Sequence, residues 1–254
     1  NHFGPIIEDE VLLVETLCEF SGQPVVVIAA ETREAIRQAK KAIQADIELL
    51  HPVFTIDEAI ERGQFLGATC TIRRGDTETA FAEADYTLEG VFINGGQDHF
   101  YLESQAAVVY PGEHQTLTVH SSTQHPSEVQ REIANLLGLQ HHQVVCISKR
   151  MGGAFGGKET QAMHPAAMAA LVALKTQRPA RIVLNKDDDM RATGKRHPFQ
   201  NNYQVAFNRD GLILGMKVHF YSDGGAMADL STSIMGRAMT HAENAYFIPN
   251  IEIT

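Results

Sequence analysis

The groups with the clearest chemical potential lie in one glycine-rich segment, residues 150–160. The segment reads RMGGAFGGKET, and glycines fill four of the six positions from Gly152 to Gly157. That density favours positive φ angles or close approach of the backbone to another group. The segment lies between a predicted strand and a predicted helix, where backbone N–H groups and a helix N-terminus can bind an anion or a developing negative charge. We therefore interpret it as a binding loop, since a plain turn needs fewer glycines.

This loop matches a nucleotide-binding P-loop only in part. Gly152, Gly157 and Lys158 satisfy the start of the pattern G-x-x-x-x-G-K-[ST], but the next residue is Glu159. A P-loop needs a hydroxyl at that position for its magnesium ion, and a carboxylate there would repel the phosphates. The G-x-G-x-x-G spacing of a dinucleotide-binding loop is absent as well. The sequence therefore predicts a ligand that tolerates or uses a carboxylate.

Three more side chains are candidate site residues, and each has a plainer alternative. Phe155 is the only large aromatic residue in the loop, and it forms either a wall against a flat substrate or a plug beneath the loop. The amide of Gln124 can donate to and accept from a bound group, or the segment that it ends caps the helix predicted to follow. Arg237 carries a planar guanidinium suited to a carboxylate or a polar heterocycle, although a lone arginine is more often a surface residue.

Residues 95–103, which read GGQDHFYLE, form a second polar cluster between two predicted strands. Gln97, Asp98, His99 and Glu103 carry possible ligand atoms, but a metal-binding spacing such as H-E-x-x-H is absent. We interpret this cluster as a hydrogen-bonded loop that supports a site.

The elements that must position these residues alternate between strands and helices. Strand patterns cover residues 86–93, 106–110, 115–120, 143–148, 181–185, 200–207 and 212–221. Helix patterns cover residues 31–46, 56–61, 126–137 and 160–176. Thr32 is the predicted cap of the first helix and Gly138 the predicted stop of the third. Residues 10–30 read as strand, turn, strand. The sum predicts an α+β or mixed α/β arrangement, with a small N-terminal module and a larger second one.

Composition limits the class of partner. The 254 residues have a net charge of -10, which argues against binding along nucleic acid or anionic lipid. Cys18, Cys70 and Cys146 are far apart without a C-x-x-C spacing, so a zinc or iron–sulfur site is not expected and a reducing, cytoplasmic compartment is favoured. A run of about 20 apolar residues that could span a bilayer is absent, and so is a signal peptide.

Together these motifs resemble the xanthine dehydrogenase and aldehyde oxidase family of molybdenum hydroxylases, in particular the bacterial xanthine dehydrogenase large subunit. Residues 2–5 and 22–25 resemble the C-terminal part of the family's small hammerhead domain. Four further segments resemble the family's first molybdopterin-binding domain, namely residues 95–103, 122–124, 150–159 and 229–237. The resemblance implies an α+β chain with three parts: a hammerhead-like domain over 1–64, a linker over 65–81 and an incomplete, mixed α/β molybdopterin-binding domain over 82–254.

The resemblance also assigns residues to the molybdenum cofactor, which is built on molybdopterin. Gln124 matches the glutamine whose side chain approaches the molybdenum's oxo group, and no residue matches a direct protein ligand of the metal. The loop that contacts the cofactor is matched by Gly153, Ala154, Phe155 and Gly156. Ala154 stands where glycine is commonest in animal relatives, which puts only the local backbone angle in doubt.

The implied substrate site contains Phe155, Glu159 and Arg237. Phe155 matches the aromatic residue that stacks on the substrate ring, and the other two match an acidic and basic pair that orients a purine. Members that prefer aldehydes usually lack this pair. The chemistry agrees, because Arg237 can stabilise negative charge that develops on a ring oxygen and Glu159 can hold or move a proton at a ring nitrogen. Gln124, Glu159 and Arg237 are therefore the implied catalytic residues.

The implied reaction is hydroxylation of hypoxanthine and xanthine to urate, with water as the oxygen source. Electrons would pass through iron–sulfur clusters and FAD on other domains or subunits to NAD. The implied partners are the remainder of the molybdenum subunit, the iron–sulfur and FAD subunit, and further copies in a higher-order oligomer. The family's glutamate that activates the attacking oxygen comes from a C-terminal half that would follow Thr254, so the chain is expected to be inactive alone. Two alternatives stay open: a hydroxylase of another N-heterocycle or an aldehyde, and a non-catalytic assembly subunit.

Overall fold

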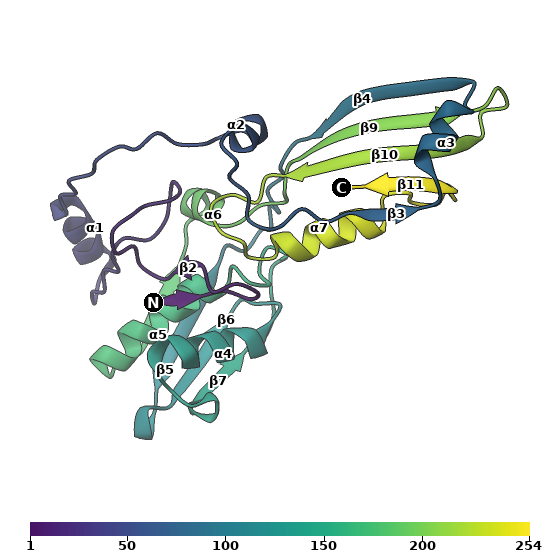
Figure 1. The fold of residues 1–254 in the computed structure, drawn as a ribbon. Coiled ribbons are helices and arrows are strands. Elements are labelled where there is room, and N and C mark those ends of the chain that lie inside the picture. Colours follow the sequence, from purple (N-terminus) through teal and green to yellow (C-terminus); the bar gives the residue numbers. More distant parts are fainter. The chain divides into compact units, whose positions relative to one another are not determined.

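The computed structural model describes all residues from 1 to 254 (Figure 1). Its contacts divide the chain into two units, each made of two separate segments. The first unit comprises Asn1–His51 and Asp98–Lys195, and the second comprises Pro52–Gln97 and Arg196–Thr254. None of the helices has the length and apolar character needed to cross a bilayer.

The first unit is built around a four-stranded sheet in the order β7, β6, β5, β8. Its strands are β5 (Ala106–Pro111), β6 (Leu117–Ser121), β7 (Val144–Ile147) and β8 (Ala180–Val183). β5 pairs antiparallel with β6 and β8, and β6 pairs parallel with β7. Two helices, α4 (Pro126–Leu137) and α5 (Met163–Thr176), pack against this sheet and against each other (Figure 1).

The core of the first unit lies between this sheet and these helices. Side chains alternate between the two faces of a strand, and Val109 and Val119 on the inner face are fully buried. They form one cluster with Val129 and Ile133 of α4 and with the alanines of α5. Because alanine side chains are small, α5 can lie close to the sheet.

The ends of these helices follow local signals. α4 begins with Pro126 in its first turn and ends at Gly138, which takes a left-handed φ of 67°, so both predicted boundaries are confirmed. α5 begins three residues later than predicted, because residues 160–162 form a turn in which the carbonyl of Thr160 accepts from the N–H of Met163.

The remaining elements of the first unit are short. They are β1 (His2–Phe3), β2 (Glu10–Val11), α1 (Arg33–Ala42), α6 (Lys186–Ala192) and two 3-10 turns, η1 (Glu113–Gln115) and η2 (His141–Gln143). The predicted cap of α1 is confirmed, since Thr32 Oγ1 accepts from the N–H of Ala35 at 3.1 Å. The strand predicted at residues 25–30 is wrong: Val25 and Val26 are each 55% exposed and pair with no strand.

The second unit contains a five-stranded sheet in the order β3, β11, β10, β9, β4. Its strands are β3 (Ile72–Arg74), β4 (Tyr86–Asn94), β9 (Phe199–Phe207), β10 (Ile213–Ser222) and β11 (Asn250–Ile253). Its helices are α2 (Ile56–Glu61), α3 (Thr77–Ala82) and α7 (Ser231–Thr240). β9 and β10 form an antiparallel hairpin, and β10 and β11 run parallel. α7 packs against β10 over a small core that contains Met239, Ile248, Ile251 and Ile253. α3 packs against the side of β10 that carries Gly215 and Lys217.

Some elements of the second unit carry no clear sequence pattern. Residues 65–81, expected as a linker, contain β3 and most of α3, and β3 pairs with β11. Eight of the 17 residues of the expected linker therefore lie in regular structure. The strand escapes prediction because Ile72, Arg73 and Arg74 lack apolar alternation. The domain boundaries at 64 and 82 stay a prediction. The broad expectation of a mixed α/β chain with several sheets is confirmed.

The buried face of the first unit's sheet provides a test of this packing. Val119 in β6 is fully buried, whereas Val145 in the neighbouring β7 is 51% exposed. Val119→Ala should lower the free energy of unfolding by about 1.5–3 kcal/mol, because two buried methyl groups are lost and a cavity remains. The matched change Val145→Ala should alter it by less than about 0.5 kcal/mol. Urea unfolding followed by circular dichroism measures both, and equal effects would contradict the packing described.

Candidate functional site

The glycine-rich loop runs through turns between β7 and α5, and its backbone requires glycine at particular positions. Gly153 and Gly156 have φ angles of 94° and 91°, in the region that favours glycine. Gly157 is required for a different reason: a Cβ there would lie 2.6 Å from Nδ1 of His99 and 2.8 Å from Cε1 of Tyr101. Phe155 also has a positive φ, 54°. Large residues rarely adopt this conformation, and such strain concentrates at functional sites.

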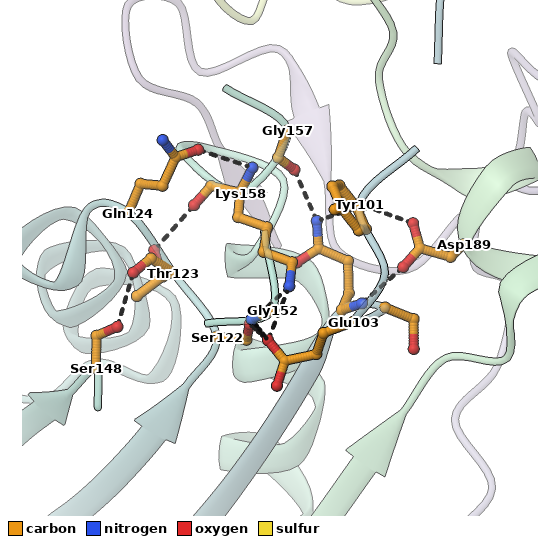
Figure 2. Close-up of polar contacts among 12 residues, drawn as sticks. Tyr101, Glu103, Ser122, Thr123, Gln124, Ser148, Gly152, Gly157, Lys158 and Asp189 are labelled. Atoms are coloured by element: carbon orange, nitrogen blue, oxygen red, sulfur yellow. Dashed lines mark hydrogen bonds and ion pairs between the residues drawn. The ribbon is translucent and has the colours of Figure 1, made fainter. Parts of the chain in front are cut away.

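The loop is fixed at its C-terminal end by Lys158, whose side chain is fully buried. Its Nζ donates to Ser122 Oγ at 2.8 Å and to Glu103 Oε2 at 3.1 Å (Figure 2). The same Nζ lies 4.7 Å from the ring centroid of Tyr101, within the range of a cation–π interaction. This ammonium is fully occupied and points into the protein, so it cannot serve as the phosphate-binding lysine of a P-loop.

The carboxylate of Glu103 joins three parts of the site. Its Oε2 accepts from Lys158 Nζ, from Ser122 Oγ at 2.8 Å and from the backbone N–H of Gly152 at 2.9 Å (Figure 2). Partial burial would raise the pKa of Glu103, but the hydrogen bonds from these three donors lower it below its usual value. Glu103 therefore stays ionised and holds the start of the glycine loop to the end of β6. This outcome agrees with the interpretation of residues 95–103 as a supporting loop.

Gln124 is oriented by the loop itself. Its Oε1 accepts from the backbone N–H groups of Gly156 at 3.0 Å and Lys158 at 3.3 Å. Because both partners are donors, they must bind the amide oxygen, and the amide nitrogen is left to donate elsewhere (Figure 2). Ser122 and Thr123 serve the same junction, since the backbone carbonyl of Lys158 accepts from Thr123 Oγ1 at 3.1 Å. The segment therefore binds the loop, and α4 has no side-chain cap.

A buried polar network that the sequence patterns do not indicate supports the loop. Gln105 is fully buried, and its Nε2 donates to the carbonyl of Gly157 at 2.7 Å. The hydroxyl of Tyr101 donates to Asp189 Oδ1 at 2.6 Å, and the other oxygen of Asp189 accepts from the N–H of Gln105 at 2.6 Å (Figure 2). Burial and the hydrogen bond to Asp189 raise the pKa of Tyr101, so the phenol stays protonated.

The loop also carries backbone donors without a protein acceptor and one exposed aromatic ring. Phe155 is 76% exposed, so it does not plug the space beneath the loop. The backbone N–H groups of Gly153, Ala154 and Phe155 donate to no protein acceptor. Glu159 is exposed and its carboxylate pairs with no cation. Arg237 belongs to the second unit, where it lies on α7 with an exposed side chain in no ion pair.

The other polar residues of the 95–103 segment have partners within the protein. Asp98 pairs with Lys195 at 3.1 Å, and Gln97 accepts from Arg196 at 3.1 Å. Burial lowers the pKa of His99, so its imidazole is neutral at neutral pH. The chain contains no group of three or more histidine, cysteine, aspartate or glutamate side chains arranged to hold a metal.

Among known protein families, the family model described as "Molybdopterin cofactor-binding domain" matches residues 60–254 of this chain.

Curated relatives extend this similarity over the whole chain. The xanthine dehydrogenase of Dictyostelium discoideum is 41% identical over 253 residues, which cover 100% of this chain and 19% of that protein. A nicotinate hydroxylase of Emericella nidulans is 38% identical over 256 residues, covering 99% of this chain and 19% of that protein. The chain therefore spans about a fifth of the length of these relatives.

A solved structure has the same fold. The aldehyde oxidoreductase of Desulfovibrio gigas superimposes with a TM-score of 0.81 and 28% sequence identity, over 88% of this chain and 26% of that chain. Its similarity covers most of both units described above.

The ionised state of Glu103 makes a prediction about pH. Because its folded pKa is depressed, its contribution to stability is present above the unfolded pKa and is lost as pH falls through the folded pKa. Glu103→Gln should therefore show a shallower loss of unfolding free energy between about pH 5 and about pH 3 than the unmodified chain. The control is Glu113→Gln, which changes an exposed glutamate. Identical pH profiles for all three proteins would refute the proposed ionic anchor.

Proposed function

Because this chain belongs to the molybdopterin cofactor-binding domain family, we propose that it forms part of the molybdenum centre of a xanthine dehydrogenase-type hydroxylase. The observation that carries the proposal is the orientation of Gln124. Two N–H groups of the glycine loop fix its amide oxygen, so its amide nitrogen is a positioned donor for an electron-rich ligand. An oxo group of the molybdenum cofactor is such a ligand.

The residues of the glycine loop fit this cofactor. The unpaired N–H groups of Gly153, Ala154 and Phe155 are further donors for its oxygen atoms, and Gly156 contributes by holding Gln124. When bound, the cofactor supplies the two-electron oxidation that hydroxylation by water requires. The residues of this chain would then bind the cofactor, orient the substrate and stabilise the negative charge that develops on it.

The proposed substrate is a purine, hypoxanthine or xanthine, which is converted to urate. Phe155 presents its exposed ring as a stacking surface for a flat heterocycle. The free carboxylate of Glu159 can accept a hydrogen bond from a ring N–H and hold its proton. The unpaired guanidinium of Arg237 can stabilise negative charge that develops on a ring oxygen. The xanthine dehydrogenases among the relatives support this substrate.

The nicotinate hydroxylase among the relatives favours a second candidate substrate, an N-heterocyclic carboxylate. Arg237 suits this class too, because a guanidinium can bind a carboxylate with two hydrogen bonds. Glu159 distinguishes the two candidates. Its carboxylate would repel an anionic substrate, whereas it would accept a hydrogen bond from a purine N–H.

The proposed reaction needs other parts of the protein. Electrons would leave through iron–sulfur clusters and FAD on further domains or subunits and pass to NAD. We propose that the enzyme functions in the cytoplasm as a higher-order oligomer that contains the remainder of the molybdenum subunit and an iron–sulfur and FAD subunit.

The test uses the intact protein that contains this chain. We expect molybdenum in the purified protein together with reduction of NAD that depends on xanthine. Molybdenum without xanthine turnover would contradict the purine substrate, and a fully assembled protein without molybdenum would contradict the catalytic proposal.

A variant tests the role of Glu159 in the same protein. Glu159→Ala should lower kcat/KM for xanthine by about 100-fold or more, as expected for loss of a group that handles a substrate proton. Turnover of an aromatic aldehyde should change little, because an aldehyde has no ring N–H for this carboxylate. The control is Glu113→Ala, at an exposed glutamate. Equal losses of kcat/KM for xanthine and the aldehyde would contradict the proposed contact between Glu159 and the purine.

A further inference from the structure

The start of α7 is held by a residue outside the helix. Most helices are capped by a Ser, Thr, Asp or Asn side chain at the N-cap position, but here the N-cap residue is Leu230 and no side chain caps the helix. The next residue, Ser231, is 6% exposed. Its Oγ lies 2.8 Å from Nε2 of His197, which comes shortly before β9. One hydrogen bond thus ties the start of α7 to the start of β9.

The other end of α7 is held by apolar packing. Met239 is 5% exposed and belongs to the cluster that contains Ile248, Ile251 and Ile253. Arg237 lies between these two attachments, on an exposed part of the helix. It is six residues after Ser231, or about 9 Å along the helix axis. The position and rotation of α7 therefore determine where the guanidinium of Arg237 lies.

The surroundings of His197 leave it one hydrogen-bond partner. Its Nδ1 is buried without a partner. Burial lowers the pKa of His197, and the charge of Asp223 opposes this effect only in part. Close packing also protects the pair, because a Cβ on Gly224 would lie 2.8 Å from Ser231 Oγ and 2.5 Å from a methyl group of Leu66. The hydrogen-bond partner of this neutral, partly buried imidazole is therefore Ser231.

We propose that His197 is a positioning residue for Arg237. Through its hydrogen bond to Ser231 it fixes the start of α7, and with it the place where the guanidinium meets the substrate. This inference rests on the proposed role of Arg237 in binding a purine. Turnover of a substrate that is bound by Arg237 should therefore require His197. Turnover of a substrate that does not contact Arg237 should not change when His197 is replaced.

The experiment compares substitutions at His197 in the intact molybdenum-containing protein. His197→Phe keeps a ring but removes the hydrogen bond, whereas the amide of His197→Gln can donate to Ser231 from about the same place. We expect His197→Phe to lower kcat/KM for xanthine by about 10- to 100-fold, as displacement of a positioned group does. Turnover of an aromatic aldehyde and the molybdenum content should be unchanged. His197→Gln should restore most of the xanthine activity, and His219→Phe, at an exposed histidine of β10, is the matched control.

A second variant protects the test from a folding defect. Ser231→Ala should reproduce the xanthine-specific loss, and adding His197→Phe to it should cause little further loss, since both changes remove one hydrogen bond. Equal losses for xanthine and the aldehyde, or additive losses in the double variant, would overturn the inference. Failure of the unmodified protein to turn over xanthine would overturn the proposed function instead. Normal xanthine turnover by His197→Phe would overturn the positioning role alone.

Discussion

The site depends on the buried charge of Lys158. Moving an ammonium group out of water costs several kcal/mol unless it is paired and hydrogen-bonded. Here the carboxylate of Glu103, the hydroxyl of Ser122 and the ring of Tyr101 compensate this cost. Displacing residue 158 would leave a buried charge without its partners. The end of the glycine loop is therefore fixed, and its start is fixed too, because Gly152 donates to the same carboxylate.

This anchoring explains how a glycine-rich segment can act as a binding site. Glycine loses more backbone freedom on ordering than any other residue, so a free glycine loop would bind a ligand at a high entropic cost. In this structure, hydrogen bonds to the side chains of Glu103, Gln105 and Gln124 order the loop. Gln105 Nε2 donates to the carbonyl of Gly157. The amide oxygen of Gln124 accepts from the backbone N–H groups of Gly156 and Lys158. Donors that are oriented in advance stabilise charge without rearrangement.

The sequence predicts the elements with strong local signals and misses those whose partners are distant. Helices at 126–137 and 56–61 have the predicted bounds, because Pro126 and Gly138 limit the first. β3 and β11 are three and four residues long; β3 pairs only with β11, and β11 lies between β3 and β10. The loop and Gln124 can be identified by residue type. The burial of Lys158 cannot, because Glu103 and Ser122 lie 55 and 36 residues away in the chain.

Hydrogen–deuterium exchange of the glycine loop tests the role of Lys158 most directly. In Lys158→Met, the hydrogen-bonded amides of Gly152, Gly156 and Gly157 should exchange at least about 10-fold faster than in the unmodified chain, because local opening no longer breaks a hydrogen-bonded ion pair. Amides of α4 and α5 should keep their protection, and Lys149→Met, at an exposed lysine, should leave the loop unchanged. Unaltered exchange of the Gly152, Gly156 and Gly157 amides in a folded Lys158→Met protein would contradict the account.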